Sequence, residues 1–124
     1  LCDTNILIEL YKNNHAVTQT LRSIGVDKIA VSDVTIAELY YGALNKTELR
    51  QIKNHLSSIH HFPLTETVSQ TFLNLMESYA LSHKISVPDA LIAATALSNN
   101  VELYSLNLKD FRFIPDLNLF QSVA

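Results

Sequence analysis

Apolar positions along this chain alternate between short runs and a helical period, which predicts strands and helices in turn. Leu1 and Cys2 end an apolar run that suits the end of a strand, and residues 4–8 suit the start of a helix. Residues 16–24 predict a second helix, and the β-branched run at residues 29–32 predicts a strand.

The later part of the chain continues this alternation. Residues 49–60 carry an apolar stripe typical of a helix, and residues 68–79 repeat apolar side chains at helical spacing. The remaining expected elements are an edge strand at 62–64, a buried helix beginning at 86–89, a strand at 101–104 and an edge strand at 117–120. This order predicts one α/β layer fold without repeats or a linker.

Three carboxylates occupy similar places in this pattern. Asp3 follows the first apolar run, Glu38 lies at the start of one apolar helix pattern, and Asp89 lies at the start of another. In an open parallel α/β sheet, ligands collect at the edge where strands end and helices begin. We therefore expect the three acids to converge on a divalent cation.

Each acid also has a structural explanation. Glu38 follows Thr35 in the T-x-x-E spacing of a capping box, and Asp89 follows Pro88 in a first helical turn. Asp3 could cap a helix, although a carboxylate at the end of a buried strand costs several kcal/mol without a partner. Because all three fall at strand-to-helix transitions, a shared function is favoured over three separate caps.

Composition limits the class of protein. The chain has 124 residues, of which 48% are hydrophobic and 17% charged, enough for one domain with a core. A net charge of −3 argues against a broad basic face for nucleic acid, but an acidic metal site can still attract a phosphate. Cys2 has no second cysteine to pair with and is expected to be a buried hydrophobe.

No apolar stretch is long enough for a membrane span and no export signal is apparent, so a cytoplasmic protein is expected. The chain begins with Leu1 rather than Met, and the first strand is expected to be longer than shown. The His residues lack metal-ligand spacing and are expected at the surface. Lys46, Arg50 and Lys53 form a basic helix stripe that could guide RNA, with a solvated face as the favoured alternative.

Four motifs in order resemble those of PIN-domain ribonucleases, specifically the VapC-type toxins of bacterial toxin–antitoxin pairs. They are residues 3–9 (DTNILIE), 35–42 (TIAELYYG), 88–96 (PDALIAATA) and 107–111 (NLKDF). The resemblance implies a PIN fold over residues 1–124, with a central, mostly parallel sheet flanked by helices. It also implies a metal-dependent endoribonuclease that hydrolyses RNA phosphodiester bonds.

The resemblance further implies roles for particular residues. Asp3 and Asp89 would bind Mg²⁺ or Mn²⁺, and Glu38 would complete the first three acidic positions. Asn107 corresponds in position to the fourth acid, and Asp110 is the weaker candidate for it. Ser105 would keep a hydroxyl at the site, and Asp110 has capping of its own turn as the favoured structural alternative. From their place beside Asp3, Thr4 and Asn5 could hydrogen-bond the ligand carboxylates, although helix capping alone would explain Thr4.

Members of this family usually form homodimers and bind a VapB-type antitoxin whose C-terminal segment covers the acidic pocket. Leu7, Leu10, Tyr11 and Leu44 would suit such a segment, or would belong to the core or a dimer interface.

Two other functions compete with the nuclease. A phosphoryl-transfer enzyme with Asp3 as nucleophile would normally carry a second Asp where Asn5 stands. A non-catalytic PIN-like module that binds RNA or protein is the stronger rival, because Asn107 replaces a carboxylate.

Overall fold

The computed structural model describes residues 1–121 as helices arranged around a narrow parallel sheet. The helices and strands are α1 Thr4–Tyr11, α2 His15–Ile24, η1 Val26–Lys28, β1 Ala30–Ser32, α3 Asp33–Tyr41, α4 Lys46–Leu56, β2 His60–Phe62, α5 Glu66–Tyr79, α6 Val87–Asn99 and η2 Leu108–Asp110. The last three residues of the expected domain, 122–124, lie outside the described residues.

The sheet extends beyond its two named strands. β1 pairs in parallel with β2, and the Cys2 N–H donates to the Ala30 carbonyl at 2.8 Å. Cys2 also bridges in parallel to Tyr104, and Leu103 bridges in parallel to Leu119. The order across the sheet is therefore β2, β1, residues 1–3, residues 103–104 and residue 119, which confirms the expected parallel α/β fold.

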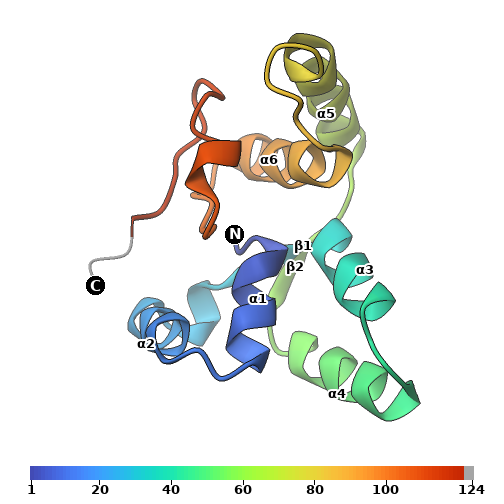
Figure 1. Ribbon diagram of the computed structural model, residues 1–124, viewed down its shortest axis with the longest axis vertical. Helices are drawn as coiled ribbons and strands as arrows, with labels where there is room; N and C mark the ends of the chain where they lie inside the picture. Colours follow the sequence, from blue (N-terminus) through green and yellow to red (C-terminus); the bar gives the residue numbers. More distant parts are fainter. Residues whose placement is uncertain (122–124) are drawn as a thin grey trace.

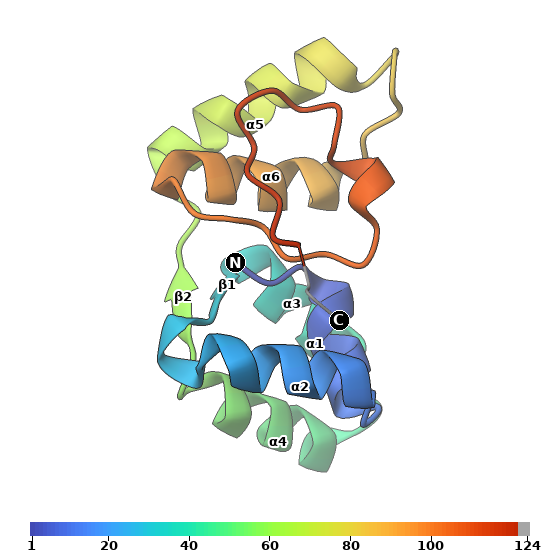
Figure 2. The same cartoon turned by 90° about the vertical axis from the view of Figure 1, so that its left-hand side faces the viewer.

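Two apolar cores lie on opposite faces of this sheet. One packs α1, α2, α3 and α4 around buried side chains such as Ile6 and Val31, and the other packs α5 and α6 around residues such as Ile92 and Phe111. Figures 1 and 2 show α5 and α6 on one side of the sheet and α1, α2 and α4 on the other. This layering leaves the carboxyl ends of the strands as a shared edge.

Two predicted boundaries are wrong. The helix expected at residues 49–60 begins at Lys46, because the Asn45 side chain accepts from the Glu48 N–H and caps it there, and it ends at Leu56. The edge strand expected at residues 62–64 instead runs from His60 to Phe62, since the following residue, Pro63, has no N–H for a ladder.

The other predicted elements are confirmed to within a few residues. Cys2 is buried as expected, with 3% of its surface exposed, and burial raises the pKa of its thiol to about 11. None of the described helices is long and apolar enough to cross a membrane.

Candidate active site at the carboxyl edge of the sheet

Asp3 lies where the first extended segment meets α1 and is almost fully buried. The Thr4 N–H donates to its Oδ1 at 2.7 Å, so Asp3 is the N-cap of α1. The Ser105 hydroxyl donates to its Oδ2, also at 2.7 Å. Burial raises the pKa of Asp3 despite these two bonds, and the negative charges of Glu38 and Asp110 raise it further. Asp3 therefore caps α1, but its two hydrogen bonds do not outweigh the cost of burying its charge.

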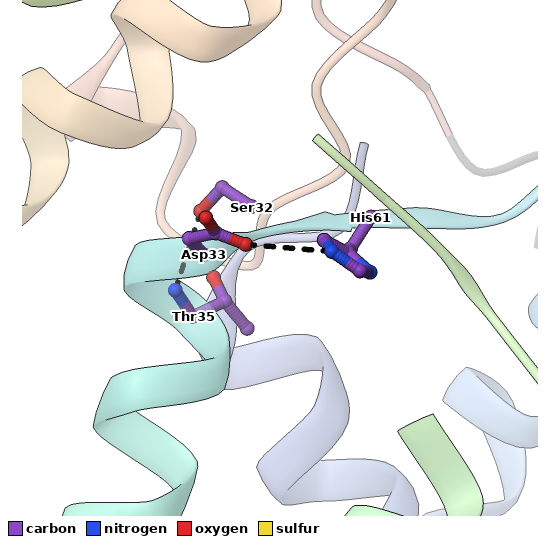
Figure 3. A network of polar contacts seen from close by, with 4 residues as sticks. All are labelled: Ser32, Asp33, Thr35 and His61. Carbon is purple, nitrogen blue, oxygen red and sulfur yellow. Dashed lines mark hydrogen bonds and ion pairs between the residues drawn. The ribbon is translucent and has the colours of Figure 1, made fainter. Parts of the chain in front are cut away.

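Glu38 has no capping role. Figure 3 shows Ser32 at the end of β1 with its hydroxyl facing the backbone of Thr35, and the Thr35 N–H donates to Ser32 Oγ at 3.2 Å. The capping box expected from Thr35 is therefore wrong, because α3 begins at Asp33, immediately after an extended Ser32. Glu38 lies beyond the first turn, where a side chain cannot satisfy the free N–H groups.

The Glu38 carboxylate instead reaches across to α1. The Thr4 hydroxyl donates to Glu38 Oε1 at 2.7 Å. Thr4 consequently contacts two acids at once, Asp3 through its backbone and Glu38 through its side chain. Loss of the capping explanation makes Glu38 a stronger functional candidate than its sequence spacing indicated.

Asp89 lies in the first turn of α6, whose N-cap is Ser86. The Asp89 N–H donates to Ser86 Oγ at 3.2 Å. Burial raises the pKa of the Asp89 carboxyl to about 6, the charges of Asp3, Asp110 and Glu38 add to the increase, and a hydrogen bond with the Ser86 side chain opposes it. Asp89 is therefore a first-turn acid as well as a member of the acidic cluster.

Ser105 connects the C-terminal part of the chain to Asp3. Ser105 is buried, with 5% of its surface exposed. Its hydroxyl oxygen accepts from the Asn107 N–H at 3.0 Å and from Asn5 Nδ2 at 3.4 Å. The Leu106 N–H in turn donates to Asn5 Oδ1 at 3.4 Å. The structure thus places Ser105 in direct contact with Asp3, and Asn5 in contact with Ser105 and the Leu106 N–H.

The two candidates for the fourth acidic position differ in their surroundings. Asn107 is exposed, and its backbone N–H is the group that joins the network. Asp110, in η2, is half-buried, and its charge raises the pKa of both Asp3 and Asp89. Asp110 is thus the one of the two whose side chain interacts electrostatically with the other acids, whereas Asn107 joins the network through its backbone.

The cluster carries uncompensated negative charge. Within residues 1–121, the side-chain ion pairs are Lys12 with Glu9 and His61 with Asp33, and neither pair includes a member of the cluster. Asp33 begins α3 but faces His61 at 3.8 Å, away from Thr35 in Figure 3. Within the same residues, no group of three or more His, Cys, Asp or Glu side chains is arranged to hold a metal ion.

A groove of about 880 Å³ adjoins the cluster between α1, α3 and α4. Glu38 lies in its wall, and apolar side chains from all three helices line it: Ile8, Leu10, Leu39 and Ile52. Leu10 and Tyr11 line the groove as expected, whereas Leu7 is a core residue and Leu44 is 85% exposed outside the lining.

The sequence did not indicate one polar contact in this groove. The Tyr11 hydroxyl and His55 Nδ1 are 2.8 Å apart, which links α1 to α4. Burial lowers the pKa of His55 and raises that of Tyr11 to about 12. His55 is thus half-buried rather than a surface histidine, unlike His15, His60, His61 and His83, which are exposed.

The basic stripe of α4 faces away from this groove. The residues of α4 that line the groove are Glu48, Gln51, Ile52 and His55. With 100° between successive residues, Lys46, Arg50 and Lys53 project from the opposite side of the helix, and all three are exposed. This placement favours a solvated face over a guide leading to the acids.

Comparison with known proteins identifies the family of this chain. The family model described as "PIN domain" matches residues 1–114. The chain is 33% identical to Ribonuclease VapC10 from Mycobacterium tuberculosis over 119 residues, which cover 94% of this chain and 89% of that protein.

Solved structures agree with that match. A toxin–antitoxin complex from Klebsiella pneumoniae contains a chain that superimposes with a TM-score of 0.79 and 30% identity, covering 94% of this chain and 92% of that one. A structure of VapBC-1 from nontypeable Haemophilus influenzae gives a TM-score of 0.76 at 29% identity, covering 97% and 95% of the two chains.

Proposed function

This chain belongs to the PIN-domain family, and we propose that it is an endoribonuclease toxin of the VapC type. The observation that carries the proposal is the group of four electrostatically coupled acids at the carboxyl edge of the sheet: Asp3, Glu38, Asp89 and Asp110. The name of the M. tuberculosis relative, a ribonuclease, supports the same reaction class. We treat residues 1–124 as one PIN domain.

We further propose that the acids bind Mg²⁺ or Mn²⁺. Carboxylate oxygens suit these hard cations. Burial first, and the charges of neighbouring acids after it, raises the pKa of Asp3 and of Asp89, and a bound cation would stabilise their ionised forms. We assign Asp3 and Asp89 as the ligands. A bound ion supplies Lewis-acid activation of water and stabilises negative charge on the phosphate.

The other catalytic and supporting roles belong to side chains of the protein. Thr4 holds one oxygen of Glu38, so we assign Glu38 to orient the attacking water and accept its proton. Ser105 keeps the Asp3 carboxylate in place, and we assign Asp110, rather than Asn107, as the fourth acid. Orientation of this kind lowers the barrier because the reacting groups need not be ordered at the moment of reaction.

A VapB-type antitoxin is the proposed partner. The groove beside Glu38 is lined by apolar side chains. Glu48 lines it as well as Glu38, and Lys12 is the one lysine or arginine among its described lining residues. A segment with apolar side chains and a cationic group would therefore fit, with the cation directed toward Glu38. We also propose a homodimer, and action on RNA in the cytoplasm.

One observation favours the alternative of a non-catalytic binding module. The acids within residues 1–121 are not already grouped closely enough to hold an ion, so a cation would have to draw them together. The two functions differ in whether RNA that is bound is also cut.

The test is cleavage of a mixed pool of structured RNA by the purified chain with Mn²⁺, with Mg²⁺ and with EDTA. We expect cleavage with either ion, none with EDTA, and loss of at least about 100-fold in Asp89→Asn, since even supporting residues of metal sites are worth 10- to 100-fold. Asp33→Asn is the matched control, because Asp33 pairs with His61 at the surface. It should cut like the wild type.

Thermal melting separates the two functions if the RNA stays intact. Mn²⁺ at saturating concentration should raise the melting temperature by several degrees in the wild type but not in Asp89→Asn, because only the folded state gathers the acids. Intact RNA together with no Mn²⁺ effect would contradict the nuclease. RNA that binds without being cut would support the binding module.

A further inference from the structure

A chain of hydroxyl groups leads from the protein core to Glu38. Thr35 Oγ1 lies 2.9 Å from Thr4 Oγ1, which in turn lies 2.7 Å from Glu38 Oε1. Thr35 is fully buried, and Thr4 is 9% exposed. The chain joins α3 to α1 and back to α3, since Thr35 and Glu38 lie three residues apart on one helix.

The number of protons fixes the direction of these hydrogen bonds. The Thr4 hydroxyl is the donor to Glu38 Oε1, so its single proton points to Glu38. The contact between the two threonines then requires Thr35 to donate to Thr4. Each hydroxyl polarises the next, and donation from Thr35 strengthens the bond that Thr4 makes to Glu38.

Thr35 uses its hydroxyl differently from Thr95 and Thr18. Thr95 is as deeply buried on α6, but its hydroxyl donates to the Leu91 carbonyl of its own helix at 2.7 Å. Thr18 likewise donates to the carbonyl of Asn14, four residues earlier. A bond to a carbonyl one turn earlier is a common way to satisfy a helical threonine, whereas the hydroxyl of Thr35 contacts a side chain on another helix.

We propose that Thr35 is a positioning residue for the reaction, one that acts on Glu38 through Thr4. Its buried hydroxyl sets the orientation of the Thr4 hydroxyl and so holds one oxygen of Glu38 in a constant place relative to Asp3. This inference rests on the proposed nuclease function and on the role of Glu38 in it. Thr35 touches neither the substrate nor the reacting atoms.

The row of hydroxyl groups also fixes the positions of Asp3 and Glu38 relative to each other. The Thr4 backbone N–H bonds Asp3 while its side chain bonds Glu38, so movement of Thr4 would displace both. Thr35 anchors that residue from the core side, where a rigid helix makes a more precise support than a loop. A hydroxyl is required at this position because an apolar side chain of similar shape cannot donate.

The test compares Thr35→Val with Thr35→Ser and with Thr95→Val. Valine keeps the shape and removes the donor, whereas serine keeps the donor. We expect Thr35→Val to lower kcat about tenfold with little change in KM, the size of loss typical of residues that support a metal-site ligand. Thr35→Ser should restore most of kcat, and Thr95→Val should leave it unchanged, although it also removes a buried hydroxyl.

A second readout uses the metal-free protein. In protein with ¹³C-labelled glutamate carboxyl groups, the NMR signal of Glu38 should shift in Thr35→Val and stay in place in Thr95→Val. Melting curves in EDTA establish that each variant is folded.

The proposal is overturned if folded Thr35→Val keeps the wild-type kcat, or if its Glu38 signal does not move. Equal losses of kcat in Thr35→Val and Thr95→Val would also overturn it, since they would indicate a general packing defect. If the wild type does not cut RNA, the proposed function fails, and the NMR comparison still decides whether Thr35 positions Glu38.

Discussion

The two sides of the acidic cluster are built differently. On the side of α1 and α3, Asp3 and Glu38 accept hydroxyl hydrogen bonds from buried residues, Ser105 and Thr4. On the side of α6 and the C-terminal segment, Asp89 is half-buried, and its partner Ser86 is exposed.

This difference follows from the burial of the partners, because Glu38 is half-buried like Asp89. A buried hydroxyl must make its hydrogen bonds within the protein, and those bonds restrict the orientation of the carboxylate that it contacts. An exposed hydroxyl such as that of Ser86 can bond water instead, which leaves its carboxylate freer to reorient. We infer that Asp3 and Glu38 define the fixed half of the site, while Asp89 and Asp110 adjust when a cation or a substrate arrives.

The largest effect expected from this comparison is that of Ser105→Ala. The change removes the hydroxyl that donates to Asp3 Oδ2 and that accepts from Asn5 and the Asn107 N–H. We expect a loss of about 10- to 100-fold in the rate of RNA cleavage, as for other residues that orient a metal ligand. Cleavage rates at saturating Mn²⁺ measure it.

Ser86→Ala is the counterpart on the adjustable side. It removes an exposed cap of α6, which costs about 1 kcal/mol of stability. The rate of cleavage by this variant should remain close to that of the wild type. If Ser86→Ala slowed cleavage as much as Ser105→Ala, the division into a fixed and an adjustable half would be wrong.

A smaller effect concerns the pH dependence of stability without metal. The pKa of Asp89 rises from its ordinary value of 3.8 to about 6 in the folded protein. The folded state therefore holds more protons than the unfolded state between these values, and stability falls as the pH rises through that window. Above about pH 6 the full destabilisation by the Asp89 charge is present.

Asp89→Asn should consequently melt at a higher temperature than the wild type at pH 7.5 in EDTA. The advantage should shrink as the pH falls below about 6 and vanish only below pH 3.8, where the wild-type carboxyl becomes protonated in both states. Melting curves from pH 4 to pH 8 measure this. Equal pH dependence in both proteins would show that folding does not raise the pKa of Asp89.

The sequence predicted the fold well because it depends on periodic apolar patterns. The helices α2, α5 and α6 follow from spacing that burial enforces. Boundaries were less predictable, since caps decide them: Asn45 starts α4 earlier than its apolar stripe, and Pro63 ends β2.

The site was predicted only in part for a similar reason. Asp3, Glu38 and Asp89 stand at visible strand-to-helix transitions, but Thr35 shared its spacing with a capping box and was assigned that role. Its contact with Thr4 joins residues 31 positions apart, and the bond between Tyr11 and His55 spans 44. Contacts of that range depend on how the helices pack, which a single sequence does not encode in any local pattern.

The smallest effect distinguishes the two candidates for the fourth acidic position. Asp110 raises the pKa of both Asp3 and Asp89, whereas Asn107 contributes a backbone N–H that any residue but proline retains. Asp110→Asn should therefore lower the rate of cleavage by less than about tenfold, below the roughly 10- to 100-fold typical of residues that support a metal ligand, and Asn107→Ala should lower it less. Because the adjustable half contains Asp110, its loss should also weaken Mn²⁺ binding in a calorimetric titration. A larger loss in Asn107→Ala than in Asp110→Asn would assign the fourth acidic position to Asn107 and make its side-chain amide part of the active site.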